Sequence, residues 1–268
     1  MEDYKIEIVN TRKGCLGGSD GYLLRQIATM GYVPRSAYKR LAIVKGLIEN
    51  ESFSSRAMQF GDFIEQNIYN NLSLNEERYE SNPLWVSEKY SKKNCKLICH
   101  PDFVLVDEKN HIINCYECKA TKFDVKATKE TYRSQMFIEW LLAHEKAENL
   151  GSDWRVQIFL CHYNTCGVNL DEDFVFDVDK LSIHKMAFKR KFFDVNNAMT
   201  IVNAFLEGFT EYYDGDEIES EYLPDKVKQE FSNITSVLKE IKEREIMVDE
   251  FKKRLCSFMQ DKGIKSIK

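Results

Sequence analysis

The stretch HPDFVLVDEKNHIINCYECK, residues 100–119, decides the fold that this sequence predicts. Two runs rich in β-branched and aromatic residues flank a polar reversal at residues 107–110, a pattern typical of a β-hairpin. Successive side chains alternate between the two faces of a strand, so Glu117 and Lys119 point to one side and Cys118 points to the other. The predicted hairpin can therefore bring the carboxylates of Asp102 and Glu117 together with the ammonium of Lys119.

These three side chains suit a metal-dependent site for phosphodiester cleavage. Two carboxylates that face one gap can bind a hard divalent cation, and a neighbouring ammonium can orient water or stabilise developing negative charge. The alternative is a set of solvated surface charges, which contribute little to stability. The hairpin by itself leaves both interpretations open.

The order of further motifs resembles a known family, the PD-(D/E)xK nucleases, and within it the YqaJ-type viral recombinases and bacteriophage lambda exonuclease. The resemblance covers about residues 11–169 in the family's order. Its motifs are Arg12, GGSD at residues 17–20, GDFIE at 61–65, HPD at 100–102, ECK at 117–119 and YRSQ at 132–135. It implies an α/β (α+β) fold with a restriction-endonuclease-like core, in which helices flank a short mixed β-sheet.

The resemblance implies a role for each residue of the hairpin. Asp102 and Glu117 would bind Mg²⁺, and Mn²⁺ is expected to substitute for it. The main-chain carbonyl of Cys118 would be a further oxygen ligand, and Lys119 would be the catalytic lysine.

Four further residues receive roles from the same resemblance. Glu65 would bind a second metal or hold a metal-bound water, and Gln135 would help to order the active site. Arg12 and Ser19 would hold the 5'-phosphate end of a DNA strand.

Helical periodicity agrees with two of these assignments. Glu65 lies beside an apolar stripe formed by Met58, Phe60, Ile64 and Ile68, so it borders the predicted core side of its helix. On a predicted helix over residues 125–148, Gln135 shares one face with Tyr132 and Glu139 and can face the hairpin.

The GGSD segment and two basic clusters are candidate contacts for DNA. Glycines with open backbone amides before a helix suit a phosphate, and Ser19 or Asp20 could cap that helix. The first cluster follows the catalytic strand, and the second occupies an earlier predicted helix; either can be an ordinary solvated helix face. The first cluster is Lys122, Lys126, Lys129 and Arg133, of which Lys122, Lys126 and Arg133 are candidate DNA-binding residues. The second cluster is Arg35, Lys39, Arg40 and Lys45.

Length, charge and cysteine content set the outer limits. The chain has 268 residues, a formal net charge of −5 and eight cysteines. A local groove can still be basic, because salt screens charges beyond about 8 Å. Cys115 and Cys118 are three apart on one predicted strand, so their side chains face opposite ways and cannot chelate one metal together. We expect reduced, mostly buried thiols in a cytoplasmic protein, encoded by a phage or prophage, with no membrane span.

The sequence predicts a nuclease domain over residues 1–213, a linker over 214–224 and a helical, coiled-coil-like tail over 225–268. The tail could pack on the domain, self-associate or bind a partner. The predicted helices are residues 21–29, 35–50, 55–71, 125–148 and 196–213, and the predicted strands are 85–90, 97–106, 112–119, 155–163 and 174–178.

The sequence and the resemblance together indicate a Mg²⁺-dependent exonuclease that degrades duplex DNA ends from 5' to 3'. The resemblance also implies a single-strand annealing protein as a partner and a homo-oligomer, a trimer as in lambda exonuclease. Two alternatives remain: an endonuclease or repair nuclease of the same fold, and a non-catalytic DNA-binding or assembly module.

Overall fold

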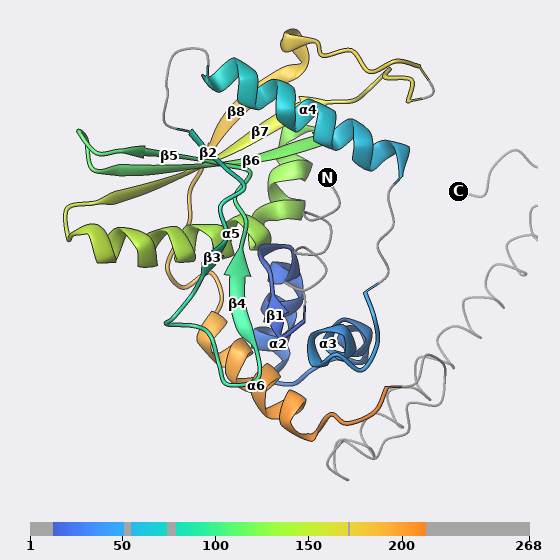
Figure 1. Ribbon diagram of the computed structural model, residues 1–268, viewed down its shortest axis with the longest axis vertical. Coiled ribbons are helices and arrows are strands. Elements are labelled where there is room, and N and C mark those ends of the chain that lie inside the picture. Colours follow the sequence, from blue (N-terminus) through green and yellow to red (C-terminus); the bar gives the residue numbers. More distant parts are fainter. Residues whose placement is uncertain (1–12, 51–54, 74–78, 171, 213–268) are drawn as a thin grey trace, which may run out of the picture. The chain divides into compact units, whose positions relative to one another are not determined.

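The computed structural model describes residues 13–50, 55–73, 79–170 and 172–212, in which two mixed β-sheets are flanked by helices (Figure 1). The predicted linker over 214–224 and the predicted tail over 225–268 lie outside the described residues. The elements in chain order are β1 (Cys15–Leu16), η1 (Gly18–Asp20), α2 (Gly21–Met30), η2 (Arg35–Ala37), α3 (Tyr38–Lys45), α4 (Arg56–Ser73), β2 (Tyr79–Ser81), β3 (Trp85–Val86), β4 (Lys96–Cys99), β5 (Phe103–Asp107), β6 (Ile112–Thr121), α5 (Val125–Leu150), β7 (Arg155–Asn164), η3 (Val178–Lys180), β8 (Leu181–Met186) and α6 (Val195–Gly208).

The larger sheet has five strands in the order β2-β5-β6-β7-β8. The predicted hairpin forms its centre: β5 and β6 are antiparallel, with Phe103 opposite Tyr116 and Asp107 opposite Ile112. β6 also pairs in parallel with β7 over its whole length. Because β7 follows β6 in parallel, the chain must cross over between them, and α5 is that crossover.

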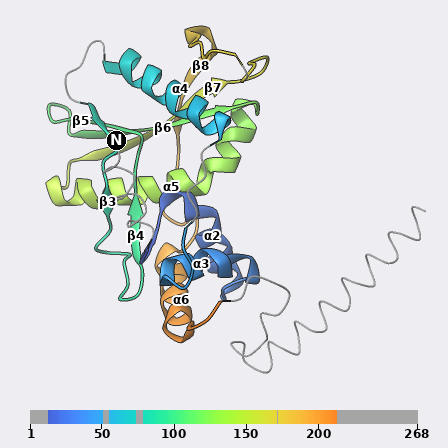
Figure 2. The ribbon, with the colours of Figure 1, turned by 45° about the vertical axis from the view of Figure 1, so that its right-hand side comes forward.

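The large sheet lies between α4 and α5, as Figures 1 and 2 both show. On the α4 side, Phe60, Ile64 and Ile68 pack with Phe103 and Tyr163 in one buried cluster. Met58, predicted to join this stripe, is instead 53% exposed. The opposite face of β6 carries Glu117 and Lys119 toward α5, as the alternation of side chains predicts.

The smaller sheet has three strands in the order β1-β4-β3, and α2 packs near it against α5 and α6. The sequence predicted one strand over residues 97–106. The structure divides it into β4 and β5, which belong to different sheets, with His100, Pro101 and Asp102 between them. Pro101 has no N–H for a sheet ladder and restricts the residue before it, so the strand ends there. Asp102 consequently lies at the junction of the two sheets.

Other predicted elements differ at their ends or in kind. The helix predicted over residues 35–50 ends at Lys45, where Gly46 adopts a left-handed conformation with φ of 79°. Residues 174–178 were predicted as a strand, but they form none; the strand that extends the sheet is β8, which was not predicted. In β8 the polar Ser182, His184 and Lys185 weaken the apolar pattern on which a strand prediction depends.

No helix in the described part of the chain is both long and apolar enough to cross a membrane. The seven described cysteines are all free thiols. Four of them, Cys95, Cys99, Cys115 and Cys161, are buried, and Cys166 is exposed.

Candidate active site

Asp102 is fixed at the start of β5 by main-chain contacts on two sides. Its Oδ2 accepts a hydrogen bond of 2.6 Å from the amide of Cys118, and its carbonyl accepts one of 2.9 Å from the amide of Asn82. The ladder between β5 and β6 begins at Phe103, the residue after Asp102, which lies opposite Tyr116. The N–H and C=O of one strand residue point to the same side, so the carbonyl of Cys118 also faces the Asp102 side.

Glu117 lies at the centre of the polar contacts on the α5 side of β6. Its side chain is 1% exposed, and its Oε1 accepts from the Lys119 ammonium and from the Gln135 amide. The Lys119 ammonium also lies 4.9 Å from the centroid of the Tyr132 ring. The structure thus brings Gln135 on α5 to the hairpin, and the face shared by Tyr132 and Gln135 is the face that meets it.

The lysine is held in its charged form. Burial by itself would lower the pKa of Lys119, but the carboxylates of Glu117 and Asp102 outweigh it and raise the pKa above its usual value. Lys119 is therefore protonated at neutral pH and donates hydrogen bonds instead of accepting a proton.

Glu139 completes the group from α5, one turn after Gln135. It is 1% exposed, and burial together with the neighbouring Glu117 raises its pKa well above the usual value. The raised pKa favours the protonated form of Glu139. Helical periodicity predicted that Glu139 shares a face with Gln135 but predicted no role for it; the spacing of four residues between the two was the available signal.

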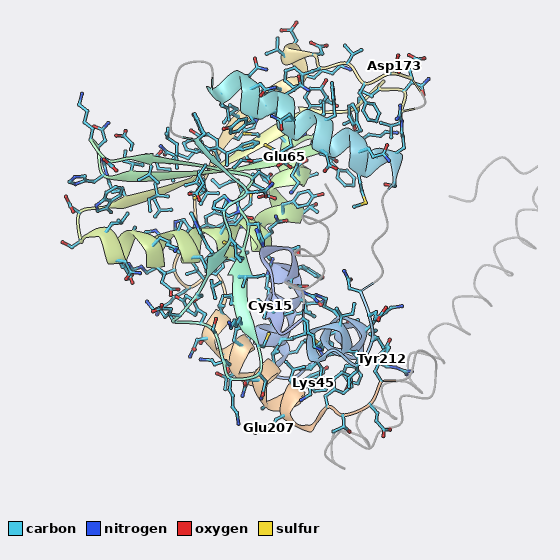
Figure 3. The ribbon with its side chains drawn as sticks, in the orientation of Figure 1. Cys15, Lys45, Glu65, Asp173, Glu207 and Tyr212 are labelled. Atoms are coloured by element: carbon cyan, nitrogen blue, oxygen red, sulfur yellow. The ribbon has the colours of Figure 1, made fainter. Side chains whose placement is uncertain are left out.

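Glu65 lies on α4, on the other side of the sheet from α5 (Figure 3), and the charges of Glu117 and Lys119 act on its carboxyl group. Its Oε1 accepts a hydrogen bond of 3.2 Å from the side chain of Asn82. Burial raises the pKa of Glu65, and so do the charges of Glu117 and Asp62. Asn82, which has a positive φ of 50°, was not predicted as a site residue; the dipeptide Asn82-Pro83 signals a turn but not a function.

The donor atoms fit a divalent cation. Burial and the charge of Glu117 raise the pKa of Asp102 well above its usual value, and one Oε atom of both Glu117 and Glu139 is buried without a hydrogen-bond partner. The ammonium of Lys119 acts electrostatically on four carboxyl groups, those of Glu65, Asp102, Glu117 and Glu139. Within the described ranges, no three Asp, Glu, His or Cys side chains form a group that could hold a metal. The predicted donor set contains only two such side chains, those of Asp102 and Glu117, together with the main-chain carbonyl of Cys118. Two carboxylates are enough for Mg²⁺, which commonly uses one or two carboxylates plus waters.

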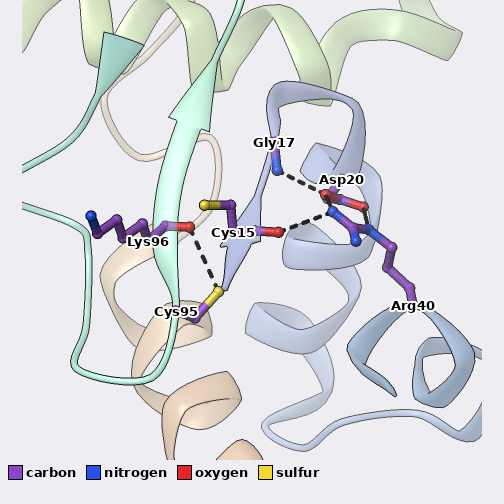
Figure 4. A network of polar contacts seen from close by, with 6 residues as sticks. All are labelled: Cys15, Gly17, Asp20, Arg40, Cys95 and Lys96. Carbon is purple, nitrogen blue, oxygen red and sulfur yellow. Dashed lines mark hydrogen bonds and ion pairs between the residues drawn. The ribbon is translucent and has the colours of Figure 1, made fainter. Parts of the chain in front are cut away.

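The predicted phosphate pocket is described only in part. Arg12 lies outside the described residues, and Ser19 is exposed on η1. Neither Ser19 nor Asp20 caps α2 through its side chain. The carboxylate of Asp20 instead accepts from the amide of Gly17 and from Arg40, which also donates to the carbonyl of Cys15 (Figure 4). These bonds fix the conformation of the loop. The loop lies beside the site, because the atoms nearest to a Cβ at Gly18 would belong to Cys99, Gln135 and Glu139.

The two basic clusters differ in the structure. In the second, Arg40 pairs with Asp20 and Lys45 donates to the carbonyl of Leu206, so both have structural roles. In the first, Lys122 and Lys126 are exposed, and Lys129 and Arg133 are partly exposed along α5. The first cluster adjoins Lys119 through Tyr132, which precedes Arg133 in the chain.

No family model and no curated protein matches this sequence. Among solved structures, the chain is similar to a phage related exonuclease from Haemophilus somnus 129PT, with a TM-score of 0.45 and 12% identity over 75% of this chain and 96% of that one. It is also similar to the protein SSO0001, with a TM-score of 0.41 and 16% identity over 71% of this chain and 74% of that one. Both TM-scores lie below 0.5, so neither similarity indicates an activity for this chain.

Proposed function

We propose that this protein is a Mg²⁺-dependent deoxyribonuclease that degrades duplex DNA from its ends. The observation that carries the proposal is the convergence of Asp102, Glu117 and Lys119 at the open end of the β5–β6 ladder, with Gln135 bound to Glu117. A purely structural ion pair would not require a third and a fourth carboxyl group beside it, because buried like charges are costly.

In the proposed mechanism, Asp102, Glu117 and the main-chain carbonyl of Cys118 would hold Mg²⁺, and Glu65 would hold a water or a second ion. The bound ion would polarise a phosphoryl oxygen and neutralise its developing charge. Lys119, fixed by Glu117 and Tyr132, donates a hydrogen bond to the attacking water or to the phosphate. Gln135 keeps the carboxylate of Glu117 in one orientation, as residues that are hydrogen-bonded to a metal ligand usually do.

The test is digestion of linear duplex DNA with either a 5'-phosphate or a 5'-hydroxyl, in Mg²⁺ or in EDTA. Wild type is compared with Lys119→Ala and with Lys109→Ala, an exposed lysine in the turn of the same hairpin. We expect Mg²⁺-dependent digestion by wild type and Lys109→Ala, and none by Lys119→Ala. Full activity of Lys119→Ala in a preparation free of contaminating nucleases would refute the proposal.

Covalently closed circular DNA separates the exonuclease from an endonuclease of the same fold. An exonuclease leaves the closed circle intact, whereas an endonuclease linearises it. If no substrate is digested and DNA is nevertheless bound, the protein is a binding module.

The finer parts of the proposal rest on the family resemblance. They are 5' to 3' polarity, a preference for 5'-phosphate ends held by Arg12 and Ser19, a single-strand annealing protein as partner, and a homotrimer. A preference for phosphorylated ends that Ser19→Ala abolishes would support the end-binding pocket.

A further inference from the structure

A strip of cationic side chains runs along α5 and continues onto α2, on a different face of α5 from the catalytic residues. It consists of Lys126, Lys129 and Arg133 on α5 and Arg25 on α2, and is called the cationic strip below. Lys126, Lys129 and Arg133 recur at spacings of three and four residues, so they lie along one face of the helix. From Lys126 to Arg133 this face extends roughly 10 Å.

The position of α2 is set by a close approach to α5. A side chain at Gly21 would lie 2.4 Å from the carbonyl oxygen of Ser134, so the two helices meet there with no atom between them. Arg25 is one turn further along α2. Figures 1 and 2 both show α2 against α5.

Two arginines from different helices meet over one aromatic ring. The guanidinium of Arg25 lies 4.8 Å from the centroid of Phe192, and that of Arg133 lies 5.2 Å from the same ring. Arginines that lie on a ring keep the N–H groups at their edges available for phosphate. Within the described part of the chain, Arg25 has no side-chain hydrogen bond or ion pair, and Arg133 has only an exposed contact of 3.9 Å with Glu130.

Other cationic groups lie near the strip, in which Glu130 is the acidic neighbour of Arg133. Burial lowers the pKa of His184 on β8, and the nearby charges of Lys129 and His162 lower it further. The segment 181–193, which carries Phe192, contains four lysine and arginine residues and no acidic residue. A chain with a net charge of −5 thus concentrates positive charge beside its candidate active site.

Two exposed aromatic rings are close in the chain to residues of the cationic strip. Phe123, just before α5, is 57% exposed, and Tyr22, three residues before Arg25, is 62% exposed. Burying such rings on a partner is favourable, and aromatic rings stack on unpaired bases. Duplex DNA offers no unpaired base, so the rings favour a single strand.

We propose that the cationic strip binds single-stranded DNA, with its phosphates on Arg25, Lys126, Lys129 and Arg133 and its bases stacked on Phe123 and Tyr22. This inference rests on the proposed function, because a nuclease that digests one strand of a duplex leaves the other strand unpaired. Charge and exposed rings together match a nucleic acid strand better than an acidic protein segment, which needs no stacking partner.

The test measures binding of a short fluorescent oligothymidylate to the full chain in EDTA, by anisotropy at several salt concentrations. The strip variant is Arg25→Gln/Lys126→Gln/Lys129→Gln. The control variant, Lys93→Gln/Lys96→Gln/Lys109→Gln, removes the same number of charges from exposed lysines outside the strip. Three lost phosphate contacts should reduce the slope of log affinity against log salt by about 2, because each contact on a single strand contributes roughly 0.7. The control should keep the slope of wild type.

A second variant, Tyr22→Ser/Phe123→Ser, tests stacking and changes two exposed positions. It should weaken oligothymidylate binding about fivefold or more for each ring and leave duplex binding unchanged. Wild-type single-strand binding by the strip variant would overturn the inference, as would equal loss of duplex and single-strand binding in the second variant. Displacement of the oligothymidylate by polyglutamate at equal charge concentration would also overturn it and indicate an acidic protein as the ligand.

The digestion assay keeps the two proposals separate. If wild type digests no DNA but the strip variant loses single-strand binding, the strip inference stands and the nuclease fails. If wild type digests DNA and the strip variant binds a single strand normally, the nuclease stands and the strip inference fails.

Discussion

The main-chain amide of Cys118 donates a hydrogen bond of 2.6 Å to Oδ2 of Asp102, across the end of the β5–β6 ladder. This bond takes the place of the next rung of the ladder, so one carboxylate oxygen is held by the sheet and the other is left for a different partner. Burial and the nearby Glu117 raise the pKa of Asp102, which means that its charged form lacks sufficient compensation among the residues around it. A divalent cation would supply that compensation.

Divalent cations should therefore stabilise the protein. We expect Mg²⁺ or Mn²⁺ to raise the melting temperature relative to EDTA, and at about 100 times the dissociation constant the gain is about 2.7 kcal/mol. Asp102→Asn should lose this gain, because it removes the charge of one proposed ligand. Differential scanning fluorimetry measures the effect, and an equal gain in Asp102→Asn would place the cation elsewhere.

The stability of the metal-free protein should fall as the pH rises. The pKa values of Asp102 and Glu139 are raised in the folded state above the unfolded value of about 4, so the folded chain holds protons that the unfolded chain has released. The resulting stability is present below about pH 4 and is lost as the pH rises through the folded pKa values.

Urea unfolding in EDTA at several pH values measures this dependence, with Glu139→Gln as the comparison. The substitution removes one titrating group, so the difference in unfolding free energy between variant and wild type should grow in favour of the variant as the pH rises. Burial lowers the pKa of His144, which acts in the opposite direction in both proteins and cancels in the difference. A difference that stays constant with pH would contradict the assignment of the proton to Glu139.

Gln135 should affect activity more than stability. Its side-chain amide donates to the Oε1 of Glu117 that also pairs with Lys119, so Gln135→Ala frees Glu117 to change orientation. Loss of a residue that orients a ligand typically costs about 10- to 100-fold in activity or metal affinity. The control is Gln26→Ala, since Gln26 donates only to the exposed Tyr22. Equal nuclease rates for the two variants would exclude a role for Gln135.

Gly21 should be intolerant of any side chain. A Cβ there would lie 2.4 Å from the carbonyl oxygen of Ser134, a backbone atom that cannot move without moving α5. Gly21→Ala should cost about 1–3 kcal/mol of unfolding free energy, the usual range for overpacking. Gly61→Ala is the control, because nothing lies within 4 Å of its Cβ position in α4, and it should stabilise by about 0.5–1 kcal/mol. Denaturant unfolding compares the two.

The Asp20–Arg40 pair should contribute far more than the exposed pair on α5. The Nε of Arg40 lies 2.8 Å from Oδ1 of Asp20, and the side chains of Asp20 and Arg40 are 10% and 22% exposed. The Nη1 of Arg40 is buried without a hydrogen-bond partner. Asp20→Ala would leave a mostly buried guanidinium uncompensated, at a cost of about 3 kcal/mol or more. Glu130→Ala removes an exposed contact of 3.9 Å with Arg133 and should cost less than about 0.5 kcal/mol. Similar losses in both variants would show that Arg40 is solvated.

Local sequence patterns were sufficient for the hairpin and the crossover helix. The alternation of side chains predicted which face of β6 carries Glu117 and Lys119. The helical period predicted that Tyr132, Gln135 and Glu139 share one face of α5. These predictions succeed because strand and helix geometry depend on neighbouring residues in the chain. The roles of the site residues stay predictions, as do the linker and tail.

Tertiary structure decided the rest. The sequence predicted one strand through residues 97–106, and only the pairing partners show that Pro101 divides it between two sheets and leaves Asp102 at their junction. Asp20 was an expected helix cap, but a partner twenty residues away takes its carboxylate. The burial of Glu139, the reach of Asn82 to Glu65 and the meeting of Arg25 with Arg133 over Phe192 likewise join distant segments. Such contacts depend on how elements pack, and packing is set by the whole chain rather than by any local period.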